Sequence, residues 1–192
     1  EIIDYRREPH PKTLLTPLLD AAGVTVWAEA DHRKLGVTRA ALGPTEHLVI
    51  WTPPPGPEVL EAARATVDPQ TITLFLVDPG LDTASTFLPR FAGLVKYALN
   101  HRDGRVDVAA LAAALAHREV TVRTALAWLA ARGDVEVVRR DAAEVVLRRA
   151  QDEADVGRAA DLAADLTVLL METAAYRRHL RRADVDSLWM RE

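Results

Sequence analysis

The amino-acid sequence predicts an α/β protein, because two periodicities alternate along its first hundred residues. Short β-branched or aromatic runs, each almost continuously apolar, are separated by stretches with helical spacing. Such runs are typical of strands covered on both faces, and repeated strand–helix–strand order favours a mainly parallel sheet with right-handed crossovers. We therefore expect a Rossmann-like sheet of about four strands flanked by helices.

Turn residues support the expected element boundaries. The strands are expected at residues 2–5, 24–27, 47–51 and 72–77, and the helices at 12–22, 57–67 and 86 to about 102, with a weaker helical segment near 37–42. Pro11 stands at a helix start and Gly23 past its end, which is the usual asymmetry of these residues. Pro57 opens the next helix, and Ser85 is a natural N-cap for the helix from residue 86.

After Gly104 the pattern changes to that of a winged-helix-like segment. We expect a short alanine-rich helix with the apolar stripe Val106, Val108, Leu111 and Leu115. A second helix is expected to begin at a Thr121 cap and to end at Gly133, before two alternating runs at 135–138 and 144–147. Helix, turn, helix and two-stranded ribbon is the order of a winged helix, and the helix ending near Arg102 would be its first.

The last stretch, from about Glu153 to Ala183, predicts one long C-terminal helix. Acidic residues stand near its start and arginines near its end, as the helix dipole favours. Its broad apolar face consists of Leu162, Leu166, Leu169, Leu170, Tyr176 and Leu180. The expected domains are thus 1–103, 104–150 and 151–192. Trp189 and Met190 could form either a docking patch or the last packing contact of this helix.

Composition excludes several classes of protein. With 192 residues, 49% of them hydrophobic, the chain is neither disordered nor fibrous. The absence of cysteine excludes disulfides, a cysteine nucleophile and a cysteine zinc site. The net charge of −4 gives no overall attraction to nucleic acid, and no apolar run approaches the roughly 18 residues of a membrane span. The strand-like start without a signal peptide suggests a piece of a longer protein.

Residues for catalysis or cofactor binding are sparse. No glycine-rich phosphate loop occurs, and neither Ser85 nor Ser187 stands in a nucleophile-elbow motif. The six histidines lack metal-ligand spacing, and Asp31-His32 is followed by two cations that would repel a metal ion. Asp4 and Asp78 could converge as a general acid/base pair in an α/β enzyme, although bonds to turn amides explain them more simply. We therefore expect no catalytic, cofactor-binding or metal-binding residue.

One stretch of the chain is basic. Residues 104–149 carry eight arginines against six acidic residues, whereas 1–103 and 150–192 each have a net charge of −3. A winged helix contacts the major groove through its second helix, here from Thr121 to Arg132. The outward residues expected there, Arg123, Thr124, Ala127, Trp128 and Ala131, offer few hydrogen-bonding groups. A DNA-binding module that contacts the duplex beside a single strand is therefore the alternative function, with weak backbone contact rather than sequence readout.

The strands and turns together resemble a known family. The Ile3-Asp4-Tyr5-Arg6 opening, the Val24–Trp27 strand followed by Ala28-Glu29, the segment Leu48-Val49-Ile50-Trp51-Thr52-Pro53-Pro54-Pro55, the Ile72–Val77 strand and the winged-helix-like segment carry the resemblance. They are similar to the C-terminal accessory domain of bacterial RecJ, the single-strand-specific 5′→3′ DNA exonuclease of recombination and repair. The resemblance covers most of the chain, to about Arg149, through strand-and-turn patterns rather than one fingerprint.

The resemblance implies a non-catalytic, cytoplasmic docking module. RecJ nucleases are DHH phosphoesterases whose Mn²⁺ or Mg²⁺ ligands lie in another region, and this sequence has neither Asp-His-His nor the oligonucleotide-binding barrel. The implied partners are the acidic C-terminal tail of the single-stranded DNA-binding protein and a helicase of HerA or RecQ type. A tail that ends in an aromatic residue and a free carboxylate fits an apolar pocket rimmed by cations. The expected partner-binding residues are Lys96, Arg102, Arg123, Arg132, Arg139, Arg140 and Arg148.

Overall fold

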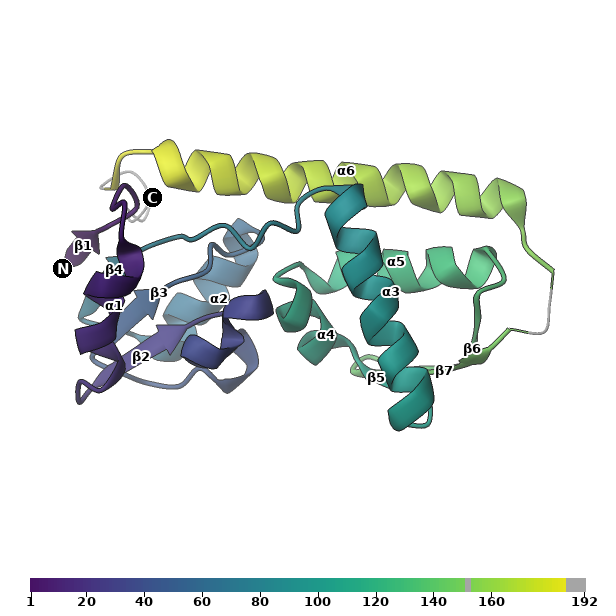
Figure 1. Cartoon of the computed structure of the whole chain (residues 1–192), viewed down its shortest axis with the longest axis horizontal. Helices are drawn as coiled ribbons and strands as arrows, with labels where there is room; N and C mark the ends of the chain where they lie inside the picture. The colour runs from purple at the N-terminus through teal and green to yellow at the C-terminus, as the bar shows by residue number, and fades with distance from the viewer. Residues whose placement is uncertain (151–152, 186–192) are drawn as a thin grey trace. The chain divides into compact units, whose positions relative to one another are not determined.

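The computed structural model describes residues 1–150 and 153–185 and divides the chain into two compact units. Unit 1 comprises residues 1–79 and the stretch from Ala174, and unit 2 comprises Gly80–Thr173. The elements, in the order shown in Figure 1, are β1 (Ile2–Asp4), α1 (Pro11–Leu19), β2 (Val24–Trp27), η1 (Ala30–Leu35), η2 (Arg39–Ala41), β3 (His47–Ile50), α2 (Pro57–Val67), β4 (Thr71–Leu74), α3 (Ala84–His101), β5 (Arg105–Asp107), α4 (Val108–Leu115), α5 (Glu119–Ala131), β6 (Val135–Arg140), β7 (Glu144–Arg149) and α6 (Val156–Arg182).

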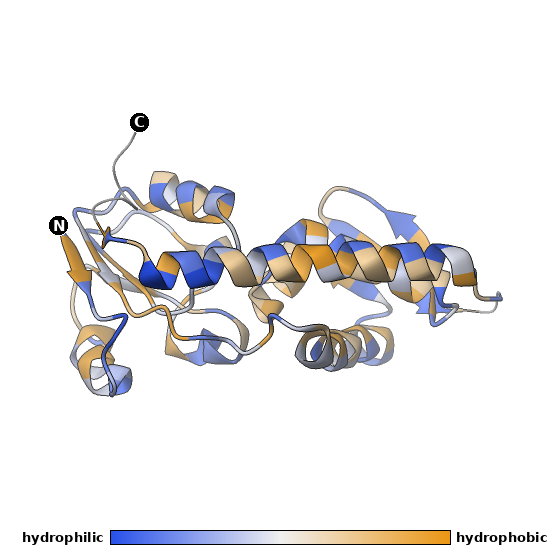
Figure 2. Cartoon of the chain, turned by 90° about the horizontal axis from the view of Figure 1, so that it is seen from above, coloured by the Kyte–Doolittle hydropathy of each residue, from blue (hydrophilic) through white to orange (hydrophobic). Residues whose placement is uncertain are grey.

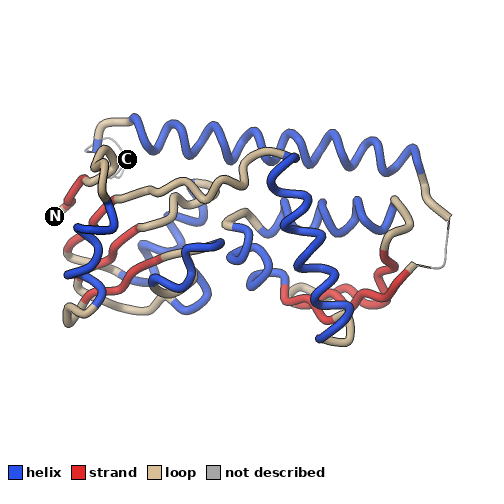
Figure 3. The backbone as a smooth tube through the Cα atoms, in the orientation of Figure 1, coloured by secondary structure: helices blue, strands red, loops and turns tan. Residues whose placement is uncertain are grey.

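Unit 1 contains the parallel sheet that the sequence predicts. Its strand order is β1-β4-β3-β2, every pairing is parallel, and Figure 3 shows these strands together in red. The connection from β1 to β2 crosses the whole sheet through α1, whereas β3 returns to β4 through α2 in the opposite direction. Because right-handed crossovers that run in opposite directions place their helices on opposite faces, the sheet is covered on both sides. The α/β prediction is confirmed.

The central strand β3 shows why its residues are almost continuously apolar. Leu48 and Ile50 face the cluster formed with α2, where Leu60 is buried. Val49 and the following Trp51 face the opposite cluster, which contains Leu15 of α1. Each of these side chains is at most 5% exposed, so both faces of the strand exclude water.

The end of helix α6 belongs to unit 1 and is held there by arginines. Arg177 is fully buried, and its Nε donates a hydrogen bond of 3.2 Å to the carbonyl of Pro53. Arg6 donates to the carbonyls of Leu180 (2.5 Å) and Ala183 (3.0 Å), which lie at the C-terminal end of the helix. Figure 2 shows this end of α6 coloured hydrophilic, whereas hydrophobic residues occupy its middle. Arg6 thus satisfies main-chain carbonyls at the C-terminal end of α6, and Arg177 binds the helix to the carbonyl of Pro53.

Unit 2 is a complete winged helix. Helices α3, α4 and α5 are followed by the β6–β7 hairpin, and β5 pairs with β7 to give the antiparallel sheet order β5-β7-β6. Phe87 and Phe91 of α3 are fully buried and stack with ring centroids 5.7 Å apart. They share one core with Leu166 and Leu170 of α6. Helix α3 therefore serves as the first helix of the winged helix, as expected, and packs in unit 2 rather than within residues 1–103.

The turn between α3 and β5 explains one glycine. Gly104 has φ of +73°, and a Cβ placed on it would lie 1.8 Å from the carbonyl oxygen of Leu147. The amide of Leu147 donates to the carbonyl of Gly104 at 2.9 Å, so β7 passes directly against this backbone. Only glycine leaves room for that approach.

Several expected element ends are wrong in detail. Val106 lies in strand β5 rather than on a helix, because pairing with Val145 of β7 extends this segment before α4 begins at Val108. Ser85 lies inside the first turn of α3, whose N-cap is Thr83. Thr121 is buried inside α5, which begins two residues earlier after Arg118. Both helices extend farther toward their N-termini than the hydrophobic pattern does.

Other ends differ less or cannot be compared. Helix α1 stops at Leu19, so Gly23 (φ +73°) precedes β2 and is not the residue that ends the helix. Gly133 (φ +74°) directly follows the C-cap of α5, as expected. Ser187, Trp189 and Met190 lie outside the described residues.

We expect the substitution Arg177→Met to lower the free energy of unfolding by about 2 kcal/mol, because it leaves the buried carbonyl of Pro53 without its donor. Arg178→Met is the matched control, since Arg178 is exposed and its side chain donates to the carbonyl of Ala174 in its own helix, at 3.4 Å. The control should change stability by no more than about 0.5 kcal/mol. Urea unfolding of both variants measures the difference, and equal effects would contradict a special role for Arg177.

The ion pair between Asp4 and Arg6 is expected to make a pH-dependent contribution to the free energy of unfolding. The side-chain hydrogen bonds from Arg6, at 2.8 Å to each carboxylate oxygen, hold the pKa of Asp4 below its ordinary value of 3.8. A lowered folded-state pKa stabilises the protein above the unfolded-state pKa, and this stability is lost as the pH falls through the folded-state value. Asp4→Asn should therefore destabilise the protein at neutral pH and lose its effect in acid. Unfolding measured across this range tests the prediction, and a pH-independent difference would refute it.

Candidate functional site on the winged-helix unit

A groove of about 490 Å³ lies between helices α3 and α5 in unit 2. Four of its α3 residues recur at helical spacing, and α5 and the start of β6 form the other wall. The lining residues are Leu88, Pro89, Ala92, Val95, Lys96, Leu99, Trp128, Leu129, Arg132, Asp134 and Val135. Most of these side chains are apolar, so the groove is suited to an apolar ligand segment.

Trp128 is the largest side chain in the groove and is half-buried. Its ring is covered on one side by the guanidinium of Arg132, 4.6 Å from the ring centroid. Leu129 and Val135, which are buried, connect this wall to the core of unit 2. The groove therefore has a fixed apolar base and an aromatic side wall.

Two of the predicted partner-binding cations lie at this groove. Lys96 is exposed on α3 and makes no ion pair within residues 1–150 and 153–185. The Nε of Arg132 lies 3.0 Å from Oδ2 of Asp134, so part of its charge is compensated at the groove itself. Lys96 is thus the cation best placed to attract an anionic ligand group to this groove.

The structure places the other predicted cations elsewhere. Arg123 donates to the carbonyls of Asp141 and Ala142 in the hairpin turn. Arg139 pairs with Glu144 at 2.6 Å, and Arg148 binds both oxygens of Glu136 at 2.6 and 2.7 Å. Arg102 lies 5.9 Å from the ring centroid of the exposed Tyr97 and does not line the groove. The seven cations therefore do not form one cluster.

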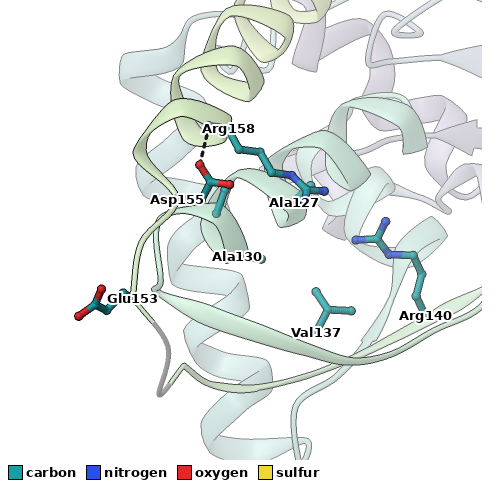
Figure 4. A pocket seen from close by; sticks show the side chains of 8 residues that line it. Ala127, Ala130, Val137, Arg140, Glu153, Asp155 and Arg158 are labelled. Atoms are coloured by element: carbon teal, nitrogen blue, oxygen red, sulfur yellow. Dashed lines mark hydrogen bonds between the residues drawn. The ribbon is translucent and has the colours of Figure 1, made fainter.

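Arg140 lies at a second, smaller hollow of about 300 Å³ between α5, β6 and the start of α6 (Figure 4). Its lining includes Ala127, Ala130 and Ala131 of α5, and Arg158 of α6. Sequence reasoning missed Arg158, because nothing in the sequence indicates that the start of the last helix lies beside α5. It identified Lys96 on the α3 wall of the groove but missed the apolar residues Leu88, Ala92 and Leu99 beside it.

Helix α5 is the helix that would contact the major groove in a DNA-binding winged helix, and it is partly covered by α6. The amide of Asp155 donates to the carbonyl of Ala131 at 2.7 Å, and Arg118 at the other end of α5 pairs with Glu172 at 2.6 Å. These contacts show that the two helices run antiparallel and side by side, as Figure 1 also shows. The expected outward residues Ala127 and Ala131 therefore line the hollow beside α6. This arrangement disfavours insertion of α5 into the major groove of a duplex.

The carboxylates considered for catalysis in unit 1 each have an arginine partner. Asp4 forms a two-point ion pair with Arg6, and Asp78 pairs with Arg181 of α6 at 3.0 Å. The simpler expectation was that these carboxylates accept hydrogen bonds from turn amides. It is confirmed for Asp4, which also accepts the backbone amide of Arg6 at 3.0 Å.

Sequence reasoning missed a buried ion pair that follows β2. Glu29 is 1% exposed, accepts the indole Nε1–H of Trp27 at 2.9 Å and pairs with Arg39 of η2. Its backbone amide donates to the hydroxyl of Thr52 at 3.0 Å. A buried glutamate that binds a tryptophan, an arginine and the next strand end fixes the β2–β3 connection. The signal available in the sequence was a single acidic residue directly after an apolar strand.

The described residues contain neither a cluster of metal ligands nor a helix suited to cross a membrane. Within residues 1–150 and 153–185, no three histidine, aspartate or glutamate side chains gather as metal ligands would. In the same residues, no helix combines the length and the apolar character that a bilayer crossing needs. The pair Asp31-His32 lies in η1, where burial lowers the pKa of His32.

Comparison with known proteins gives no assignment. No family model, curated protein or solved structure matches the chain.

Proposed function

We propose that this chain is a non-catalytic docking module that binds an acidic peptide in the groove between α3 and α5. The observation that carries the proposal is the apolar groove of about 490 Å³ with Trp128 as its side wall and Lys96 at its edge. An aromatic residue of the peptide would pack against Trp128 and Leu88, and its free C-terminal carboxylate would bind Lys96. Acidic residues farther along the peptide would favour association with the basic winged-helix segment.

The proposed parent protein is a cytoplasmic RecJ-like 5′→3′ exonuclease that acts on single-stranded DNA in recombination and repair. The docked peptide would be the acidic tail of the single-stranded DNA-binding protein, or a segment of a helicase of HerA or RecQ type. Docking would place the nuclease on its substrate. The Mn²⁺ or Mg²⁺ of such a nuclease would belong to its catalytic region, since the described residues of this chain supply no fitting ligand set.

We expect Trp128→Ala and Lys96→Glu each to weaken binding of a synthetic acidic peptide ending in phenylalanine by about tenfold or more. The first substitution removes the aromatic wall of the groove, and the second reverses the charge at its edge. Amidation of the peptide's C-terminus should weaken binding to the parent chain and have less effect on the Lys96→Glu variant. Isothermal titration calorimetry with the full chain measures these affinities.

Matched controls separate the groove from general effects. Tyr97→Ala removes an exposed aromatic ring of α3 that does not line the groove, and Lys12→Glu reverses an exposed charge on α1. Both should leave peptide affinity within about twofold. If the controls weaken binding as much as the groove variants do, or if no acidic peptide binds, the docking proposal fails.

The non-catalytic assignment has its own test. The chain mixed with Mn²⁺ and a 5′-phosphorylated single strand should release no nucleotides, because its candidate carboxylates are bound by arginines. Gel analysis of labelled DNA, with an active nuclease in the same buffer as a positive control, measures this. Metal-dependent turnover by the chain alone would contradict the assignment. An Asp-His-His motif encoded upstream of Glu1 would support the proposed parent, and an unrelated upstream sequence would count against it.

A further inference from the structure

A β-bulge turns Arg140 toward the helices of unit 2. The regular pairing of β6 with β7 places Val137 opposite Leu147, but a register shift follows, so that Arg140 lies opposite Val145. Residues opposite each other in an antiparallel pair share a face, and Leu147 and Val145 are buried on the helix-facing side. If the register before the shift continued, Arg140 would lie opposite Glu144 on the outer face. The bulge therefore places an exposed cation on the helix-facing side of the hairpin.

The outer face of the hairpin shows the contrast. There Arg139 pairs with Glu144, and Arg148 binds Glu136 through two hydrogen bonds. Arg140, on the helix-facing side, has no ion pair or side-chain hydrogen bond among the described residues. Among the described residues, Arg140 thus differs from Arg139 and Arg148, whose charges are compensated by carboxylates of the hairpin.

A second guanidinium, that of Arg158, lines the same hollow as Arg140. Figure 4 shows the side chain of Arg158, from the first turns of α6, extending toward Ala127, with the side chain of Arg140 directed into the same space from β6. The guanidinium of Arg158 also has no partner within the described ranges. Both arginines are exposed, and two cations that line one hollow favour the binding of an anion between them.

The acidic residues of the lining do not provide that anion. The carboxylate of Asp155 accepts the backbone amide of Arg158 at 3.0 Å and so belongs to the start of α6. Glu153 lines the hollow as well, but Figure 4 shows its side chain directed away from both arginines. The floor consists of Ala127, Ala130 and Ala131, whose small side chains leave a volume of about 300 Å³.

We infer that this hollow is a binding site for one phosphate group of a nucleic-acid backbone, held between Arg140 and Arg158. A phosphate presents its oxygens in several directions, so two guanidinium groups that approach from different elements can each bind it, whereas a planar carboxylate is matched by a single guanidinium fork. Because α6 covers this side of α5, the contact is made at the backbone and reads no bases. The inference is independent of the peptide groove and gives the winged helix a second ligand.

The test uses the full chain, a labelled oligothymidylate, a labelled duplex of equal length, and inorganic phosphate. The double variant Arg140→Ala/Arg158→Ala should weaken DNA binding on the order of tenfold. It should also reduce the salt dependence of log K by about 0.7 for the single strand or about 0.9 for the duplex, as expected for one lost phosphate contact. Comparison of the two DNAs identifies which form supplies the phosphate, and competition by inorganic phosphate alone would show a free-anion site and overturn the nucleic-acid assignment.

Two further variants make the result specific. Arg139→Ala/Arg148→Ala removes the same charge from paired arginines and should have little effect on DNA binding. Ala127→Glu keeps both arginines but places a carboxylate at the floor, and should weaken DNA binding as the arginine double variant does. Equal losses in both arginine double variants, or absence of DNA binding by the parent chain, would overturn the inference. So would a loss of acidic-peptide affinity without a loss of DNA affinity, because the hollow would then belong to the peptide site.

Discussion

The burial of Phe87 and Phe91 is the packing constraint on which the winged-helix unit depends. Their stacked rings fix which side of α3 faces the core, and Val95 continues that side. Once this face is buried, Leu88, Ala92, Lys96 and Leu99 lie beside it on the same helix and form the wall of the groove. The surface that we propose as a peptide site is thus a by-product of core packing, and its cation is presented by the same helix that holds the core together.

The distribution of arginine partners decides which charges can act on a ligand. Most arginines of the winged helix are bound to carboxylates or carbonyls of the same unit, which makes the basic stretch of the sequence far less cationic than its composition suggests. Exposed ion pairs contribute little to stability, but they remove a guanidinium from competition for an external anion. The groove between α3 and α5 and the smaller hollow beside α6 differ in the charges that they offer. One offers apolar surface with a lysine at its edge, and the other offers two guanidiniums above small side chains.

Periodicity was sufficient to predict the parallel sheet, the winged-helix order and the long last helix. These features follow from which residues must be buried, and apolar patterning reports that directly. The helix ends were less predictable, because Ser85 and Thr121 are good capping residues that lie within the first turns of their helices. Strand β5 was missed because it has a single buried residue, Val106, and exists through its pairing with β7.

The candidate site was harder to predict than the fold, because a side chain's partner depends on tertiary position. Composition identifies Arg139, Arg140 and Arg148 as equivalent, yet the hairpin pairs two of them and leaves the third facing the helices. The cause is Val138, the residue by which β6 is longer than its partner requires. A hairpin of the same sequence without the register shift would pair residue 140 with Glu144 and place it on the outer face, with no change in net charge. The register of the hairpin, and not its composition, therefore determines which arginine lines the second hollow.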